Sequence, residues 1–241
     1  MRLHITGATG YLGSELVRLR PNASTERVEV RDAEAVRELF ERYRPEVVIH
    51  TAYRQEEPVV NVDGAENVAR AAAAVGARLV HMSSDVVFDG LKGEPYVEED
   101  LLSPVSSYGA SKAEAEGRVA AAFPKALIVR TSLILGGAKP SKHELAATGP
   151  GPWFTNEIRS PVQVTDLAQA LLELAELDVS GPLHVAGADG VSRAELAELV
   201  ARSPVPTAEA PPTRPLDCRL DSSRVRSVIR TRLRGVREVL G

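Results

Sequence analysis

Residues 3–13, Leu3-His4-Ile5-Thr6-Gly7-Ala8-Thr9-Gly10-Tyr11-Leu12-Gly13, join a short apolar run to a turn with glycine at every third position. In a strand–turn–helix unit, the glycines allow a tight turn at Gly7, close approach of a pyrophosphate at Gly10 and close helix packing at Gly13. Free N–H groups and the positive end of the helix dipole then face the phosphates. An ordinary glycine-rich turn is the alternative, but the position at the first strand–helix junction favours dinucleotide binding. The predicted contacts are Gly7, Thr9, Gly10, Tyr11, Leu12 and Gly13.

Short β-branched runs alternate with longer helical patterns up to about Arg130, which is typical of a parallel sheet with crossover helices. The strands are near-continuous apolar runs, as expected of strands covered on both faces. Four strands are clear, Arg2–Thr6, Glu46–Thr51, Arg78–Met82 and Ala126–Arg130, and a fifth, Val28–Val30, is weaker. Helices are predicted at Tyr11–Arg20, at Ala33–Tyr43 after the N-cap Asp32, at Asn61–Val75 and at Ser106–Phe123. The pattern predicts an α/β fold with a Rossmann-like, doubly wound parallel sheet.

The pattern changes after residue 130, where loops rich in glycine and proline separate shorter elements. A loop is predicted at Gly136–Pro152, a helix at Asp166–Leu177, a strand at Pro182–Ala186, a helix from the capping box Ser192–Glu195 to Arg202, and an extended connection at Ser203–Pro215. Two short helical stretches close the chain. We therefore predict a dinucleotide-binding domain at 1–130 and a smaller α/β substrate lobe at 131–241, with some segments of the lobe returning to the main sheet.

The composition excludes several classes of protein. The 241 residues carry a formal charge of −4, so no overall basic field would hold nucleic acid or an anionic membrane. No apolar run approaches the roughly 20 residues that span a bilayer. Cys218 is the single cysteine, which rules out an internal disulfide and indicates a cytoplasmic protein. The five histidines lack ligand spacing such as HxxxH, so no metal site is predicted.

Tyr108 and Lys112 lie four residues apart, on one face of a predicted helix. A nearby ammonium stabilises phenolate, so we expect Lys112 to lower the pKa of Tyr108 from about 10 towards neutrality. Such a tyrosine can protonate a carbonyl oxygen as hydride reaches the carbon. The alternative for this pair by itself is a solvated helix face.

Ser84 follows a predicted strand, within Ser83-Ser84-Asp85-Val86-Val87-Phe88-Asp89-Gly90. The carboxyl ends of parallel strands meet at the ligand crevice, where a hydroxyl can donate to a substrate carbonyl oxygen. A strand end satisfied by local Ser and Asp hydrogen bonds is the alternative. The combination of Ser84 with Tyr108 and Lys112 favours a catalytic set.

Together these features resemble the extended short-chain dehydrogenase/reductase family, and in particular its dTDP-4-dehydrorhamnose reductase branch. The resemblance spans nearly the whole chain and also rests on the following stretches: 37–49, Arg-Glu-Leu-Phe-Glu-Arg-Tyr-Arg-Pro-Glu-Val-Val-Ile; 95–100, Pro-Tyr-Val-Glu-Glu-Asp; 130–132, Arg-Thr-Ser; 184–187, His-Val-Ala-Gly; 191–193, Val-Ser-Arg; and 219–223, Arg-Leu-Asp-Ser-Ser. The resemblance implies that Tyr108 is the general acid, that Lys112 supports it and holds the ribose, and that Ser84 donates to the carbonyl.

The same resemblance implies further contacts. Cofactor contacts are expected at Val30, Thr51, Ala52, Tyr53 and Ser83, and substrate contacts at Asp85, Leu133 and Trp153. Asn61 matches an asparagine of the family, which implies a role in the site. A role as a helix-capping residue is about as good an interpretation of Asn61. Packing is the simpler interpretation of Trp153 and Cys218. Arg214 could clamp a phosphate together with Asp217, but a solvated surface position is the simpler interpretation of this arginine.

The segments that would face the adenosine and the sugar are shorter than in the family, at Pro21–Arg27, Arg54–Val60 and Gly136–Arg159. The leading hypothesis is an NAD(P)H-dependent reductase of a ketone, either a nucleotide-activated 4-keto sugar or a smaller keto substrate. Arginines at 18, 20, 27 and 31 favour NADP over NAD. Two alternatives stay open: a nucleotide-sugar epimerase or dehydratase, and a non-catalytic NAD(P)-binding module like the regulatory subunit of methionine adenosyltransferase. The identity of the substrate, the stereochemistry of the reaction and whether the protein forms a homodimer are likewise left open.

Overall fold

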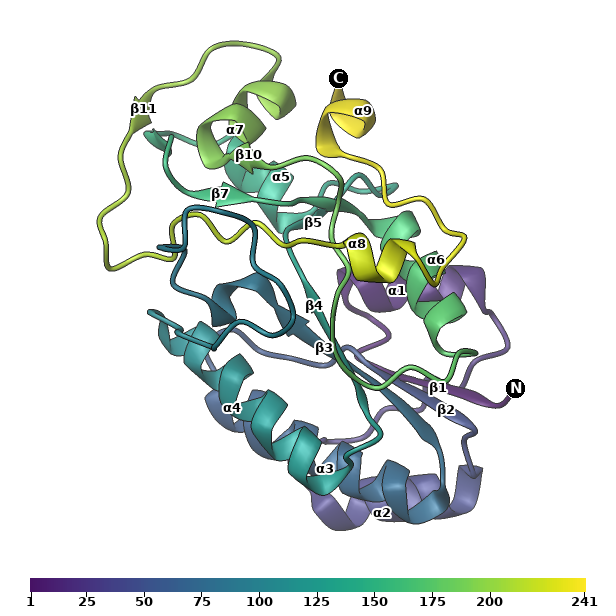
Figure 1. The fold of residues 1–241 in the computed structure, drawn as a ribbon. Helices are drawn as coiled ribbons and strands as arrows, with labels where there is room; N and C mark the ends of the chain where they lie inside the picture. The colour runs from purple at the N-terminus through teal and green to yellow at the C-terminus, as the bar shows by residue number, and fades with distance from the viewer.

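A computed structural model describes all residues, 1–241, and its centre is a parallel sheet of five strands in the order β1-β2-β3-β4-β9 (Figure 1). The strands are β1 (Leu3–Thr6), β2 (Val47–His50), β3 (Arg78–Ser84), β4 (Leu127–Thr131) and β9 (Gly181–His184). All four neighbouring pairs are parallel. The predicted α/β, Rossmann-like fold is therefore confirmed.

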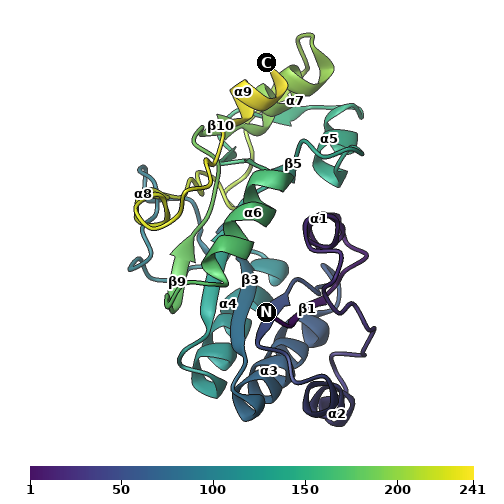
Figure 2. The ribbon, with the colours of Figure 1, turned by 90° about the vertical axis from the view of Figure 1, so that its right-hand side faces the viewer.

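Helices cover both faces of the sheet, as Figure 2 shows. One face packs against α1 (Tyr11–Leu19) and α6 (Val164–Leu174), and the other against α2 (Ala33–Tyr43), α3 (Pro58–Val75) and α4 (Ser107–Ala122). Alternate strand residues serve the two faces, since Val47 and Ile49 belong to the core of α1 and α6 whereas Val48 belongs to the core of α2 and α3. The sheet is therefore doubly wound, and its strand ends are fixed by two separate cores.

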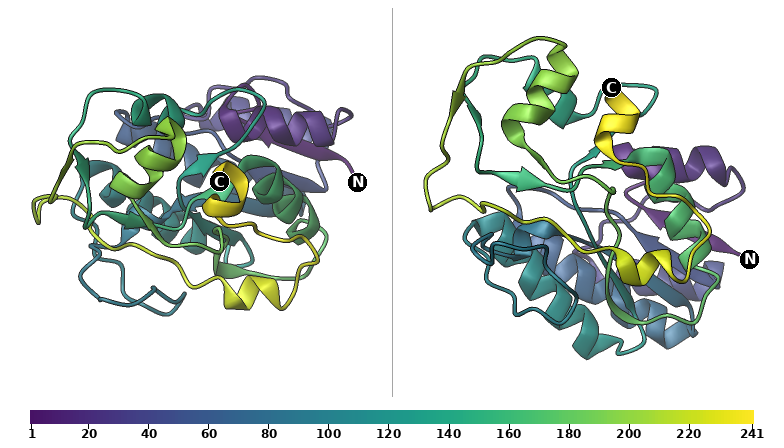
Figure 3. Two further views of the ribbon diagram at one scale, coloured as in Figure 1. Left: turned by 90° about the horizontal axis from the view of Figure 1, so that it is seen from above. Right: turned by 45° about the horizontal axis from the view of Figure 1, so that its top comes forward.

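Short elements lie beyond the carboxyl ends of the strands (Figure 3). They form three two-stranded pairs, β5 (Ile134–Leu135) with β8 (Val162–Gln163), β7 (Ile158–Arg159) with β10 (Val191–Ser192), and β6 (Trp153–Phe154) with β11 (Thr207–Ala208). The helices here are α5 (Lys142–Ala147), α7 (Arg193–Ala201), α8 (Ser223–Arg226) and α9 (Val236–Leu240). The domain boundary at residue 130 stays a prediction, because α6 and β9 pack on or within the main sheet.

The predicted strand Val28–Val30 is wrong, because another residue occupies the edge of β1. The Ser24 N–H donates to the Leu3 carbonyl at 2.8 Å, and the Ile5 N–H donates to the Ser24 carbonyl at 3.0 Å. This one-residue bridge leaves the chain after Ser24 free to turn away, and Val30 packs against Gly64 of α3 instead.

The loop predicted at Gly136–Pro152 contains α5, whose start carries a complete capping box between Ser141 and Glu144. That Ser-x-x-Glu signal was present in the sequence and was missed. At the box that was predicted, Ser192 does cap α7, but the carboxylate of Glu195 binds Arg237 instead of the helix start. The helix predicted at Asp166–Leu177 is α6, Val164–Leu174 in the structure. It begins earlier than predicted because Gln163 caps it by accepting the Asp166 N–H. No helix of the structure has both the length and the apolar character needed to cross a membrane.

Candidate active site

The glycine turn connects β1 to α1 with a geometry that depends on two of its three glycines. Gly7 adopts a φ of +68°, and a Cβ there would lie 2.7 Å from the Ala52 nitrogen. A Cβ on Gly13 would overlap the Gly7 carbonyl oxygen. Gly10, in contrast, is exposed and has only that same oxygen nearby, at 3.2 Å. Gly7 and Gly13 therefore fold the turn, and Gly10 leaves its outer surface open to a ligand backbone.

The segment after β2 lies directly against this turn. The Thr51 hydroxyl donates to the Thr6 carbonyl at 2.7 Å, so it holds the turn in place. Tyr53 is 43% exposed, and its ring lies 5.9 Å from the Tyr108 ring. The predicted cofactor residues Thr51, Ala52 and Tyr53 thus run from the glycine turn to Tyr108.

Tyr108 approaches Ser84 because α4 packs unusually close to the short 3₁₀ helix Asp85–Val87. Gly109 permits this contact, since a Cβ there would overlap the Val86 carbonyl oxygen. The Ser84 hydroxyl donates to Asp85 at 3.2 Å and lies close enough to the phenol to lower its pKa. The structure thereby brings together two of the three predicted catalytic residues at the end of β3.

Lys112 lies one turn further along α4, buried beneath the same strand end. Its ammonium donates to the Met82 carbonyl at 2.5 Å, and burial lowers its pKa to about 8, opposed by the charge of Glu116. We expected Lys112 to lower the pKa of Tyr108, and this is wrong. Burial, together with the charges of Tyr53 and Asp85, raises the pKa of Tyr108 well above its usual value, so the phenol is a proton donor at neutral pH.

Asp85, a predicted substrate contact, belongs to a buried polar network. Its carboxylate accepts the Ser132 hydroxyl at 2.6 Å and lies 3.7 Å from the Arg159 guanidinium. Burial raises the pKa of Asp85, and the charge of Arg159 opposes this shift. Arg159 also donates to the carbonyls of Pro215 and Leu216. Asp85 therefore ties the strand end beside Tyr108 to the segments that follow residue 131.

Two polar residues near the site serve other side chains. Ser83 is a predicted cofactor residue. Its hydroxyl donates to the Glu116 carboxylate at 2.5 Å, so its hydrogen already has an acceptor within the protein. Asn61 is not the N-cap of α3. Its amide pairs with the backbone of Arg54 at 2.8 and 2.9 Å and donates to the Ser111 hydroxyl. Asn61 thus fastens the loop after Tyr53 to α4.

The two predicted sugar-side contacts, Leu133 and Trp153, have different surroundings. Leu133 packs on the small core that includes Leu135 and Leu196. Trp153 is half-buried in β6, with the Arg193 guanidinium 5.7 Å from the centre of its ring. A packing role accounts for Leu133. Trp153, in contrast, has the Arg193 guanidinium above its ring.

Sequence reasoning missed a cluster of basic side chains on α5 and α7. The Lys142 ammonium donates to the Tyr53 hydroxyl and to Gln55, both at 3.0 Å. Arg193 has a buried Nη1 with no hydrogen-bond partner. Burial, together with the charges of Arg193 and Lys142, lowers the pKa of His143 to about 3, so this imidazole is neutral at neutral pH. The basic cluster, defined as Lys142, His143 and Arg193, thus carries the positive charges of Lys142 and Arg193, and Lys142 contacts Tyr53. The missed capping box of α5 was its one sequence signal.

Val30, a predicted cofactor residue, packs on Gly64 of α3. Of the four arginines expected to favour NADP, Arg31 lies next to Val30 and pairs with Glu29 at 2.9 Å, and Arg18 pairs with Glu15. Arg20 and Arg27 form no ion pair.

The remaining predictions concern residues outside this crevice. Cys218 is fully buried and packs with Phe88, as expected. The phosphate clamp of Arg214 with Asp217 does not form, because Arg214 pairs with Glu157 at 2.8 Å and Asp217 pairs with Arg219. No three His, Cys, Asp or Glu side chains lie close enough together to hold a metal ion.

Comparison with known proteins identifies the family. The model of the RmlD substrate binding domain matches residues 1–241. The chain belongs to this family. It is 36% identical over 218 residues to a dTDP-4-dehydrorhamnose reductase of Mycobacterium tuberculosis, covering 80% of this chain and 72% of that protein. It is 30% identical over 269 residues to the methionine adenosyltransferase 2 subunit beta of Rattus norvegicus, covering 90% of this chain and 80% of that protein.

A solved structure gives the same result at the level of the fold. The dTDP-4-dehydrorhamnose reductase from Bacillus anthracis, in complex with NADP, matches with a TM-score of 0.86 at 26% identity, covering 99% of this chain and 95% of that chain. The predicted family resemblance is therefore confirmed. Members include reductases and a subunit of another enzyme, so membership alone leaves both the catalytic and the binding interpretation in place.

Proposed function

We propose that this RmlD-family protein is an NAD(P)H-dependent reductase of a ketone. The observation that carries the proposal is the meeting of Ser84 and Tyr108 at the carboxyl end of β3, where Lys112 is buried against the same strand and the glycine turn is reached through Thr51–Tyr53. The residues fit a dinucleotide, because Gly10 leaves the turn surface open and no side chain from the turn occupies that space. When bound, the reduced dinucleotide supplies the hydride.

The chain's own residues would supply the proton and the positioning. Ser84 turns its hydroxyl from Asp85 to donate a hydrogen bond to the substrate carbonyl oxygen, and Tyr108 donates the proton that this oxygen takes up. Burial favours this role, since it keeps the Tyr108 phenol protonated at neutral pH. The Lys112 ammonium donates to the Met82 carbonyl at the same strand end, and its proposed role is to hold the ribose hydroxyls of the dinucleotide, as the family resemblance implies.

We propose a nucleotide-activated 4-keto sugar as the substrate. The basic cluster supports an anionic substrate, because Lys142 reaches Tyr53 at the edge of the site and Arg193 keeps an unsatisfied N–H. A diphosphate would supply acceptors for these donors. The name of the Mycobacterium tuberculosis relative points to the same class of substrate.

For the coenzyme we propose NADP. Arg31 beside Val30 is the cation that a 2′-phosphate would recruit from its pairing with Glu29. The NADP complex of the Bacillus anthracis reductase is consistent with this choice.

The deciding experiment compares Tyr108→Phe with the parent for oxidation of NADPH by 4-keto nucleotide sugars and simple ketones. Loss of the proton donor should lower hydride transfer by about 10²–10⁴-fold and leave dinucleotide affinity nearly unchanged. Tyr43→Phe is the matched control, because its hydroxyl donates to the Leu3 carbonyl and is not among the groups that meet at Tyr108. Equal turnover by the parent and Tyr108→Phe would remove Tyr108 from the reaction. Tight dinucleotide binding by a parent that reduces no ketone would instead favour a binding subunit, the role suggested by the rat relative.

A further inference from the structure

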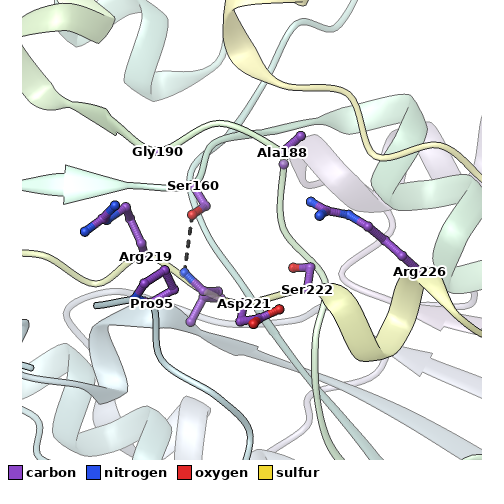
Figure 4. A pocket seen from close by; sticks show the side chains of 10 residues that line it. Pro95, Ser160, Ala188, Gly190, Arg219, Asp221, Ser222 and Arg226 are labelled. Carbon is purple, nitrogen blue, oxygen red and sulfur yellow. Dashed lines mark hydrogen bonds between the residues drawn. The ribbon is translucent and has the colours of Figure 1, made fainter. Parts of the chain in front are cut away.

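A pocket of about 240 Å³ is lined by none of the residues of the proposed active site. Figure 4 shows it between the segment that links β9 to β10 and the segment that leads into α8. Its lining residues come from four parts of the chain, at Pro95, at Ser160, at 187–190 and at 219–226. None of them was predicted to contact cofactor or substrate. The proposed reductase activity therefore leaves this pocket without a role.

Arg226 gives the pocket a cation with no partner in the protein. Its guanidinium forms neither an ion pair nor a side-chain hydrogen bond, and it extends from α8 into the pocket towards Ala188 (Figure 4). The other arginine of the lining, Arg219, is neutralised by Asp217 at 2.6 Å. Five N–H donors of Arg226 are thus available to an acceptor that the protein does not supply.

Asp221 is the one carboxylate of the lining, and it is already engaged. Its Oδ1 accepts the Ser223 N–H at 2.7 Å, which holds it towards the start of α8. The Ser223 hydrogen bonds lower the pKa of Asp221, and the charge of Arg226 adds a smaller effect. Asp221 lies beyond ion-pair distance of Arg226, so it offsets part of the positive charge without satisfying the guanidinium.

Two buried hydroxyls add donors to the same pocket. Ser222 accepts the Ala186 N–H at 3.1 Å, and Ser160 accepts the Leu220 N–H at 3.3 Å. Neither hydroxyl hydrogen has an acceptor in the protein, although both side chains are at most 3% exposed. Each serine therefore has its oxygen fixed by the backbone and its hydrogen free to point into the pocket.

We propose that this pocket binds an oxyanion, a phosphate or carboxylate group carried by a small molecule, between Arg226 and the hydroxyls of Ser222 and Ser160. Charge-assisted hydrogen bonds from a guanidinium fork are the strongest available to such a group. The volume lies below the roughly 300–1,000 Å³ of drug-sized sites, so it suits an anionic group with few further atoms. Gly190 leaves room for the side chain of Arg219, which forms part of the lining.

The test is titration of the ¹⁵N-labelled full chain with inorganic phosphate, and separately with acetate, followed by amide NMR. We expect saturable shifts at Ala188 and Gly190 with at least one of the two anions, and the stronger response assigns phosphate or carboxylate. Arg226→Gln should raise the dissociation constant about tenfold or more. Arg224→Gln is the matched control, since it removes the same charge from α8 at an arginine that faces Glu99. It should leave the constant nearly unchanged.

Shifts confined to residues 7–13, or equal weakening by Arg226→Gln and Arg224→Gln, would overturn the proposal. The same two variants should bind NADPH and turn over like the parent. Failure of the anion site is therefore distinguishable from failure of the proposed reductase activity.

Discussion

Lys112 is a buried ammonium, and its burial should make the stability of this fold depend on pH in a defined window. Only 3% of the residue is exposed, and burial lowers its pKa from 10.5 to about 8. Below pH 8 the lysine is charged in both the folded and the unfolded chain, and the folded state bears the full cost of burying that charge. Between pH 8 and 10.5 the unfolded chain holds the proton and the folded chain has lost it, so stability rises with pH.

The size of the effect follows from the shift. A difference of about 2.5 pKa units corresponds to about 3 kcal/mol at 1.36 kcal/mol per unit. The neighbouring histidines on β2 and β3 do not interfere, because burial lowers the pKa of His50 to about 3 and that of His81 well below its usual value. Both are neutral throughout the window.

The assay is urea unfolding of the parent and of Lys112→Met at intervals from pH 7.5 to 10.5. Other titrating groups, such as Cys218, cancel in the difference between the two proteins. The free energy of unfolding of the parent, relative to Lys112→Met, should rise by about 3 kcal/mol across the window. Lys125→Met, at an exposed position, is the control, and its difference from the parent should stay flat. If the difference in unfolding free energy between the parent and Lys112→Met were also independent of pH, burial would not lower the pKa of Lys112, and the reasoning would be refuted.

Three further predictions test the crevice and its support. Gly10→Val should fold normally, because a Cβ there meets only the Gly7 oxygen at 3.2 Å, but it should abolish dinucleotide binding in calorimetry; unchanged affinity would remove the turn from the site. Arg31→Gln should weaken NADPH binding at low salt and spare NADH, and a parent that binds NADH more tightly would reverse the proposed preference. Arg130→Met should cost about 3–5 kcal/mol in urea unfolding, since it leaves the buried Glu116 carboxylate without its 2.8 Å partner; a loss below 1 kcal/mol would contradict this.

The sequence alone determined the fold class and the identity of the central catalytic candidates. Apolar runs of strand length, the glycine spacing of 7–13 and the four-residue spacing of Tyr108 and Lys112 are local patterns. Local patterns can be read without the fold, because the backbone period places neighbouring side chains on known faces. Strand ends then converge for topological reasons, which is why Ser84 could be assigned to the crevice before any coordinates.

Features that depend on distant segments were decided only by the tertiary structure. Ser24 takes the edge of β1 and displaces the strand expected at Val28–Val30, and Arg159 closes on Asp85 from another part of the chain. The direction of the Tyr108 pKa shift was misjudged for the same reason. The spacing of Lys112 was visible, but burial, which outweighs a neighbouring charge, depends on everything packed around the phenol. The unpartnered Arg226 likewise belongs to this class, because a free guanidinium can be recognised only once every other acceptor has been placed.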